Sequence, residues 1–325
     1  MYDEIEELEL KNCPDCIIFQ KINQSSTDKL AVSYYEKVSP TEELFSGGIE
    51  LFHLDQSSKK LTSLSYSSGT AVFDFKWKNN IIWAVNADCT ITHRTVEEDI
   101  VGRETIHAKL PQKPLMLSNQ NQSIFCACEK GVVCCYEEQQ PDSCLWGSNV
   151  FSDNTWCIEE DLKFGCVYCG SDDGRAARID TRDISDPFIW KPLRKAFSEG
   201  VTCISQAYNN PLQLIIGSFG NCFQIFDKRK LSEPLNEFSV DGGVWRISQQ
   251  NNIVIAALSF AKTYQIFLWN QGSLESVGIF RGTHDSLLYS IDCNSAGLIA
   301  SGSFYDKKIN VRDANKHLPS NGVWG

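Results

Sequence analysis

Three short stretches near the C-terminus combine side chains that could act on a carbonyl compound. They read GGVWR at 242–246, HDS at 284–286 and FYD at 304–306. Imidazole and carboxylate groups can activate water as general bases, and a guanidinium group can stabilise the oxyanion that forms at the carbonyl. Aromatic rings can bind a cation through their faces. The three stretches are therefore the first candidates for a functional site.

Familiar hydrolase and metal motifs do not account for these residues. The sequence GSDDG at 170–174 has Asp172 where the serine of a Gly-x-Ser-x-Gly motif would stand, and His-Glu-x-x-His is absent. CPDC at 13–16 and CVYC at 166–169 have Cys-x2-Cys spacing. A zinc site needs four converging ligands, however, and the second pair would lie on one strand whose side chains alternate faces. We expect no metal and no cofactor.

The elements that must position the three stretches recur along the chain. Four segments share a short apolar strand, a turn of small residues and a second strand; they are 167–180, 214–227, 253–270 and 297–313. Their ends are 43 to 47 residues apart, and steps of 40 to 43 residues back along the chain reach Glu137, Arg94 and Leu54. This period is typical of WD40-type propeller blades.

The repeats predict an all-β fold, a seven-bladed WD40-type β-propeller with degenerate repeats, formed by 1–325 as a single domain. The first blade would take its early strands from CIIFQKI (16–22) and LAVSYYE (30–36). STDKLAV (26–32) and SPTEELFSGG (39–48) are predicted as loops.

The repeats depart from the usual WD pattern, in which a Trp, a His and a turn Asp form hydrogen bonds inside each blade. The Trp position reads Ile179, Phe226, Trp269 and Arg312, and a His leads into a blade only at His284. Apolar packing must therefore hold most blades together.

Propeller topology predicts that the three stretches meet. The loop leading into each blade lies on the same face as the turn between its second and third strands. The stretches would therefore surround one mouth of the central channel. There, Gly242 and Gly243 would let the backbone turn tightly beside a ligand, and Trp245 and Arg246 would begin the strand that lines the channel.

Charge and composition argue against several classes of partner. The net charge of −11 opposes nucleic acid and anionic membrane, because phosphate binding depends on Lys and Arg. No apolar run approaches the roughly 20 residues needed to cross a bilayer. The start MYDEIEELEL has no leader pattern, and 14 cysteines spread over a long chain are typical of free thiols. We expect a cytoplasmic monomer.

The same stretches resemble a known family. GGVWRI (242–247), HDSLLYSID (284–292) and SFYD (303–306) are similar to the diphthine methylesterases, WD-repeat enzymes also called diphthine methyltransferases. AVFDFKW (71–77) and VYCGSDDGRAARIDTR (167–182) match the same family in chain order. The resemblance implies hydrolysis of the methyl ester of diphthine on translation elongation factor 2, so that the carboxylate can be amidated to diphthamide.

For that reaction His284 would be the general base on water, oriented by Asp306 or Asp285, and Arg246 would polarise the ester carbonyl. A structural alternative stands beside each role. His284 and Asp306 occupy the usual His and turn Asp places of a blade, where they would simply bond each other. Arg246 could instead form an ion pair with an acid such as Asp241.

The substrate of the family carries a trimethylammonium group. Trp245, Tyr289, Phe304 and Tyr305 could form an aromatic cage for it, although the same rings would also serve as propeller packing. Ser286 is a further candidate at this mouth. The alternative function is a non-catalytic WD-repeat scaffold, for example an adaptor in a vesicle-tethering complex.

Overall fold

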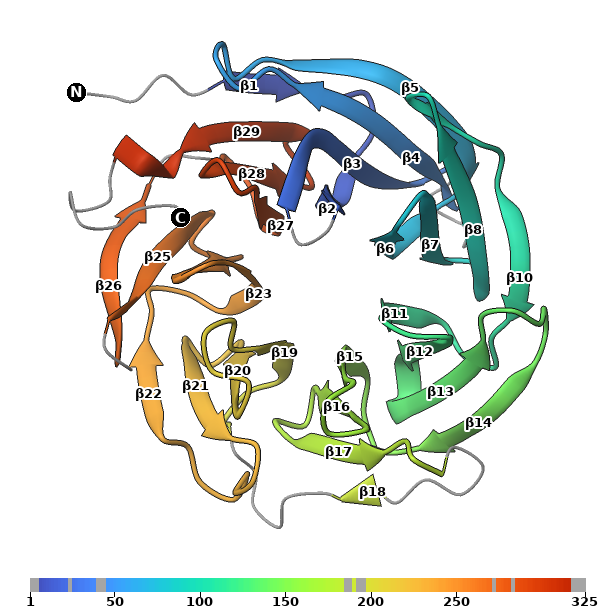
Figure 1. Cartoon of the computed structure of the whole chain (residues 1–325), viewed down its shortest axis with the longest axis vertical. Helices are drawn as coiled ribbons and strands as arrows, with labels where there is room; N and C mark the ends of the chain where they lie inside the picture. The colour runs from blue at the N-terminus through green and yellow to red at the C-terminus, as the bar shows by residue number, and fades with distance from the viewer. Residues whose placement is uncertain are drawn as a thin grey trace. The chain divides into compact units, whose positions relative to one another are not determined.

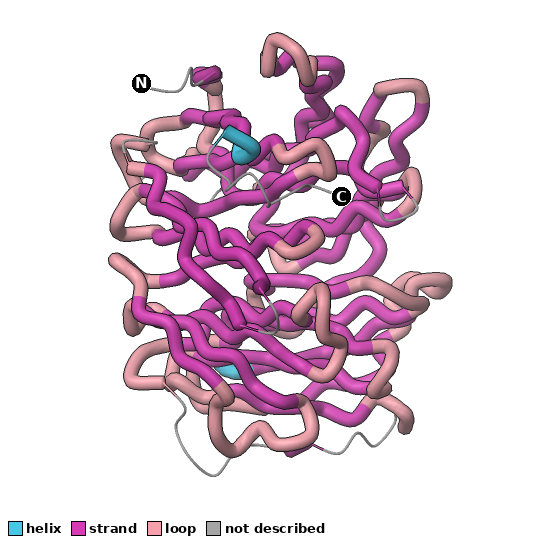
Figure 2. The backbone as a smooth tube through the Cα atoms, turned by 60° about the vertical axis from the view of Figure 1, so that its left-hand side comes forward, coloured by secondary structure: helices cyan, strands magenta, loops and turns pink. Residues whose placement is uncertain are grey.

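The computed structural model describes residues 6–22, 25–38, 45–183, 189–190, 197–270, 273–281 and 284–316. These residues form strands joined by turns, with two single-turn 3₁₀ helices, η1 (Glu129–Gly131) and η2 (Ala314–Lys316) (Figure 2). The predicted all-β fold is confirmed.

The strands of the described residues, labelled in Figure 1, form seven sheets. The chain divides into two compact units. The first unit comprises Met1–Val72, Thr95–Arg103 and Trp245–Gly325, and the second comprises Phe73–Arg94 and Glu104–Val244. Three sheets belong mainly to the first unit and four to the second.

The first unit contains the sheets at the two ends of the chain. One sheet has the order β2 (Pro14–Ile22), β3 (Ser25–Lys37), β4 (Phe45–Leu54) and β5 (Leu61–Thr70). Another runs β23 (Val244–Gln250), β24 (Ile253–Leu258), β25 (Thr263–Asn270) and β26 (Ser273–Phe280). The third is formed by β27 (Leu288–Cys293), β28 (Leu298–Ser303), β29 (Lys308–Asp313) and β1 (Glu6–Glu9).

The second unit follows the same plan. Its first sheet is formed by β6 (Val72–Lys78), β7 (Ile81–Asn86), β8 (Thr90–Glu97) and β10 (Thr105–Lys109), with β9 (Ile100–Val101) paired to the end of β8. The next is formed by β11 (Pro114–Ser118), β12 (Ser123–Cys128), β13 (Val132–Glu137) and β14 (Cys144–Asn149). Then come β15 (Thr155–Asp161), β16 (Cys166–Ser171), β17 (Ala176–Asp180) and β18 (Ile189–Trp190). The last has β19 (Val201–Gln206), β20 (Gln213–Ser218), β21 (Cys222–Asp227) and β22 (Asn236–Ser239).

The predicted repeat period matches the third strand of each sheet. The ends predicted at Leu54, Glu137, Asp180, Asp227, Asn270 and Asp313 are the last residues of β4, β13, β17, β21, β25 and β29. Arg94 is the exception, because it lies inside β8, which continues to Glu97. The spacing of the repeats therefore located one corresponding strand in every sheet.

Aspartate ends several of these third strands for a local reason. The Asp180 carboxylate accepts a hydrogen bond from the backbone N–H of Arg182 at 3.1 Å, and Asp227 accepts one from Arg229 at 2.8 Å. A short acidic side chain that bonds the backbone two residues ahead favours a turn over further strand. The Asp-x-Arg sequence thus favours a turn at the ends of β17 and β21.

The N-terminal strand closes the last sheet. β1 pairs antiparallel with β29, from Glu6 opposite Val311 to Glu9 opposite Lys308. Leu8 packs against the apolar cluster that contains Ile309. The repeat analysis gave no strand here, because a strand of three glutamates and one leucine carries too little pattern by itself.

The predicted loop at 26–32 was wrong, because these residues lie in β3. In this hairpin Phe19 pairs with Leu30, and Ile17 pairs with Val32. Leu30 and Val32 belong to the core cluster, and Ala31 and Ser33, which point to the opposite face, are buried as well, so this part of β3 is covered on both faces. Of the other predicted loop, residues 45–48 lie in β4 and 39–44 lie outside the described residues.

A buried ion pair joins two neighbouring sheets of the second unit. Lys228, just after β21, donates from Nζ to Asp161 Oδ2 at 2.6 Å and to Gln206 Oε1 at 2.9 Å. The side chains of Lys228 and Asp161 are both buried. Removing one partner of such a pair leaves the other charge buried without compensation.

We predict that Asp161→Asn destabilises the protein by about 3 kcal/mol, because the Lys228 ammonium would lose its counter-ion in a buried site. Urea unfolding at pH 7 measures the change. Glu233→Gln is the control, because Glu233 pairs with Lys230 at 3.3 Å on the surface, where an ion pair contributes little. Equal effects of the two substitutions would contradict the prediction.

Candidate active site

The loop before β27 and the turn before β29 are joined by one carboxylate. Asp306 Oδ2 accepts a hydrogen bond from the backbone N–H of Asp285 at 3.0 Å, and Asp306 Oδ1 accepts one from the N–H of Lys308 at 3.2 Å. His284 Nδ1 lies 3.7 Å from the same Oδ2. The structure therefore brings His284, Asp285 and Asp306 together, as the strand order requires.

His284 is held from both sides of its ring. Its Nε2 lies 2.9 Å from Ser301 Oγ on β28, and its Nδ1 faces Asp306. The order of carboxylate, imidazole and hydroxyl is that of a hydrolytic triad. The exposed fraction, however, is 0 % for the His284 side chain and 1 % for Ser301. These groups face each other inside the sheet. This arrangement matches the alternative in which His284 and Asp306 stabilise the blade by bonding each other.

The pKa of the Asp306 carboxyl reflects this network. Partial burial would raise the pKa, but the nearby His284 imidazole and Ser303 hydroxyl and the hydrogen bond from the Asp285 backbone outweigh it and lower the pKa below its ordinary value. Asp306 is therefore ionised at neutral pH and holds the loop before β27 against the turn before β29.

Asp285 and Ser286 lie at the surface end of this arrangement. The Asp285 side chain is 87 % exposed, and its carboxylate is 3.6 Å from Lys308 Nζ. Its backbone carbonyl accepts a hydrogen bond from Lys262 Nζ at 2.8 Å. Ser286 is half-buried in the bend that follows. Asp285 is thus the carboxylate of the loop that an external molecule can reach.

The four predicted cage residues form a continuous aromatic wall. Trp245 and Tyr289 have ring centroids 5.5 Å apart, and Tyr289 and Phe304 are 5.3 Å apart. Tyr305 meets Phe304 edge-on at 5.0 Å. Because the rings contact one another, a cation cannot fit between them and can bind only on the outer surface of the wall.

Tyr35 and Asp15 extend this wall, and the sequence analysis missed both. The Tyr35 ring on β3 lies 4.4 Å from Phe304. Burial raises the pKa of Tyr289 to about 12, and the charges of Tyr305 and Asp15 add to the rise. The charge of Asp15 raises the pKa of both Tyr35 and Tyr289, so its carboxylate lies within electrostatic range of the rings. No local signal in the sequence could have paired Tyr35 with a residue almost 270 positions away.

Arg246 lies against the same wall. Its guanidinium carbon is 5.1 Å from the centre of the Trp245 ring, and its Nη1 donates to the Trp245 carbonyl at 3.3 Å. A cation over an indole face is a favourable contact. The wall therefore already holds one cation of the protein itself.

Gly242 and Gly243 belong to the second unit. Both are buried. A Cβ atom on Gly243 would lie 3.0 Å from the Phe219 ring and 3.2 Å from the Phe219 backbone. The backbone at Gly243 is outside the left-handed region. The lack of a side chain at Gly243 thus serves close packing against Phe219.

No group of three or more His, Cys, Asp or Glu side chains in the described part of the chain is arranged to hold a metal ion. Across the described ranges, helices are too short and too polar to span a membrane.

The fold places the chain in a class of proteins. It superposes with a TM-score of 0.73 on a chain in the crystal structure of the mitotic checkpoint complex, at 11% identity, covering 94% of this chain and 90% of that one. It superposes with a TM-score of 0.69 on the WD40 propeller domain of Doa1, at 13% identity, covering 93% and 92%. The chain is a seven-bladed WD40-type β-propeller with degenerate repeats.

Relatives by sequence agree with the resemblance drawn from the motifs. The chain is 22% identical over 294 residues to a protein of Dictyostelium discoideum named diphthine methyltransferase homolog, covering 78% of each chain. It is 35% identical over 81 residues to the diphthine methyltransferase of Homo sapiens, covering 25% of this chain and 17% of the human one. No family model matches. The similarity to diphthine methyltransferases is thus confirmed.

We predict that Asp306→Asn lowers stability at pH 7 and that this loss disappears in acid. The folded-state pKa of Asp306 lies below its unfolded value, so its contribution is present above about pH 4 and is lost as the pH falls through the lower folded-state pKa. Urea midpoints of the wild type and the variant should converge in acid. A gap that stays constant with pH would show that the charge of Asp306 is not what stabilises the loop.

Proposed function

We propose that this protein is a diphthine methyl ester hydrolase acting on translation elongation factor 2. Water would add to the ester carbonyl, the bond to the methoxy group would break, and carboxylate, methanol and a proton would result. The similarity to diphthine methyltransferases supports the pathway. One observation carries the site assignment: the motif residues Trp245, Tyr289 and Phe304 form a single wall beside the acidic Asp15.

The wall suits the cationic part of this substrate. A trimethylammonium group has no hydrogen to donate, so ring faces and nearby carboxylates are the groups that can attract it. Tyr305 is 65 % exposed and offers the most accessible ring. We place the substrate cation on the outer surface of the wall near Tyr305, away from the Arg246 cation at Trp245, and the protein's acidic net charge also favours it.

The proposed catalytic roles follow from which side chains a substrate can reach. Arg246, held at Trp245, would donate N–H groups to the developing oxyanion. Asp285, the exposed carboxylate, would act as the base on water. His284 and Asp306 would be positioning residues that hold the Asp285 loop. Ser286, in the bend after Asp285, would shape the approach. We further propose that the enzyme works as a cytoplasmic monomer.

We predict that Tyr305→Ala raises KM about 5-fold, because it removes a cation–π contact of about 1 kcal/mol. The assay incubates purified protein with elongation factor 2 that carries the methyl ester and follows the modified peptide by mass spectrometry. Tyr208→Ala is the matched control, because Tyr208 is a similarly exposed tyrosine, at 57 %, in the second unit. If both variants behave alike, Tyr305 does not bind the substrate.

We predict that Asp285→Asn lowers kcat at least 100-fold, as expected for loss of a general base. His284→Gln can still bond Ser301 and should lower kcat far less. The opposite result, with kcat lost only in His284→Gln, would return the base role to His284.

The alternative is an adaptor propeller without catalysis. Exposed Phe260 and Tyr305, on corresponding turns of neighbouring sheets, would suit contact with a partner protein. The two functions differ in one measurement. If folded wild-type protein binds elongation factor 2 but leaves the methyl ester intact, the adaptor function replaces the hydrolase.

A further inference from the structure

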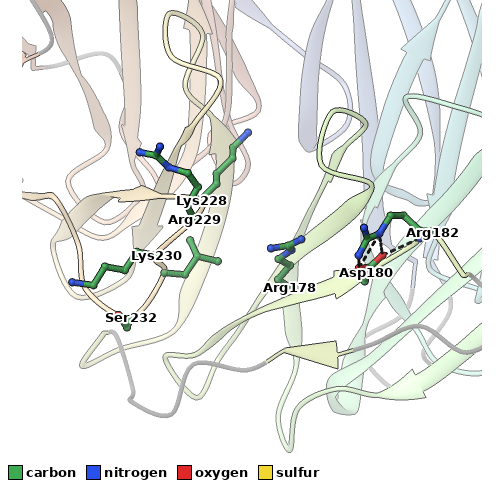
Figure 3. Close-up of a pocket in the computed structure, with 8 residues that line it drawn as sticks. Arg178, Asp180, Arg182, Lys228, Arg229, Lys230 and Ser232 are labelled. Atoms are coloured by element: carbon green, nitrogen blue, oxygen red, sulfur yellow. Dashed lines mark hydrogen bonds and ion pairs between the residues drawn. The ribbon is translucent and has the colours of Figure 1, made fainter.

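The second unit contains a basic pocket that the proposed reaction does not use. It has a volume of about 500 Å³, and its polar lining consists of Arg178, Asp180, Arg182, Lys228, Arg229, Lys230 and Ser232. β17 and the turn after it form one side, and the turn after β21 forms the other (Figure 3). This is a local reversal of charge in a chain whose net charge is −11.

Two arginines in the pocket are held by the turn aspartates described above. Arg229 donates from Nε to Asp227 Oδ1 at 2.9 Å and from Nη2 to Oδ2 at 2.6 Å. Arg182 makes the same two-pronged contact with Asp180 (Figure 3). Each contact fixes a planar guanidinium group and leaves Nη1 outside it. The turns thus present oriented donors whose direction is set by the Asp-x-Arg sequence.

Most cations of the pocket have an acidic partner. Lys228 pairs with Asp161 at 2.6 Å, and Lys230 pairs with Glu233 at 3.3 Å. Arg178 is different: it is half-buried, its electrostatic neighbours are Asp180 and the Cys166 thiol, and Asp180 is already paired with Arg182. In Figure 3 it lies between the Asp180–Arg182 pair and the lysines and arginine that follow β21. The pocket therefore has one cation in excess at its centre.

We infer that this pocket binds a small phosphate-bearing ligand. Arg178 offers a forked set of N–H donors, and Nη1 of Arg182, Nη1 of Arg229 and the Ser232 hydroxyl line the same cavity. A phosphate group has three terminal oxygens to accept from donors on several sides, whereas a carboxylate has two. The small excess of charge and the acidic protein surface disfavour a long polyanion such as nucleic acid.

Calorimetric titration with inorganic phosphate at constant ionic strength tests this inference, with sodium chloride as the blank. Wild-type protein should give saturable binding, and Arg178→Gln should weaken it at least 10-fold. Arg175→Gln should bind like the wild type, because Arg175 lies outside the pocket on the same sheet, near Asp173. Glycerol phosphate in a second titration distinguishes a phosphate ester from free phosphate as the source.

A second variant tests the inference even if Arg178→Gln does not fold. Arg182 is exposed, so Arg182→Gln should fold normally, yet it removes a donor and releases the Asp180 carboxylate into the pocket, which should weaken phosphate binding at least as much. Absence of saturable binding to the wild type, or equal binding by both pocket variants and the wild type, would overturn the inference. So would binding of a glutamate-rich peptide without binding of phosphate. Because the readout is binding, the result is independent of ester hydrolysis.

Discussion

A sheet of four short strands cannot bury both of its faces alone, and this constraint governs the whole chain. Apolar side chains from neighbouring sheets must form shared clusters. In the first unit one cluster joins Phe19, Leu30 and Phe52 of β2–β4 to Ile309 and Val311 of β29. Burying each such side chain contributes about 1.5–3 kcal/mol. Polar networks can therefore be sparse, as the missing WD tryptophans imply.

The same packing between neighbouring sheets also positions the residues of the candidate site. Because β2 and β3 pack beside the last sheet, Tyr35 reaches Phe304 although the two lie at opposite ends of the sequence. Polar contacts position only one part of the site. Asp306 fixes the loop of Asp285 to a turn of its own sheet. Apolar stacking thus sets where the aromatic wall lies, and a single carboxylate sets where the accessible acid lies.

How well the sequence predicts an interaction depends on how far apart its partners lie along the chain. The strand ends at Asp180 and Asp227 were readable, because repeat spacing and turn chemistry act within a few residues. The pairing of β1 with β29 and the contacts of Tyr35 were not, since they join distant segments whose own patterns are ordinary. β3 was misread in part because its polar start resembled a loop, while the burial of Leu30 depended on partners elsewhere.

Charge in this protein acts both over the whole surface and inside a single pocket. The net charge of −11 acts over the whole surface and favours an approaching cation, which suits the aromatic wall of the first unit. Screening at physiological salt limits such fields to about 8 Å, so a cluster of fixed arginines can still reverse the sign inside one pocket. The Asp-x-Arg turns supply oriented donors to this pocket, because each aspartate both ends a strand and orients a guanidinium group, while the excess positive charge comes from Arg178. One short motif, repeated at the strand ends of two blades, therefore serves the fold and creates the donors of a second binding site.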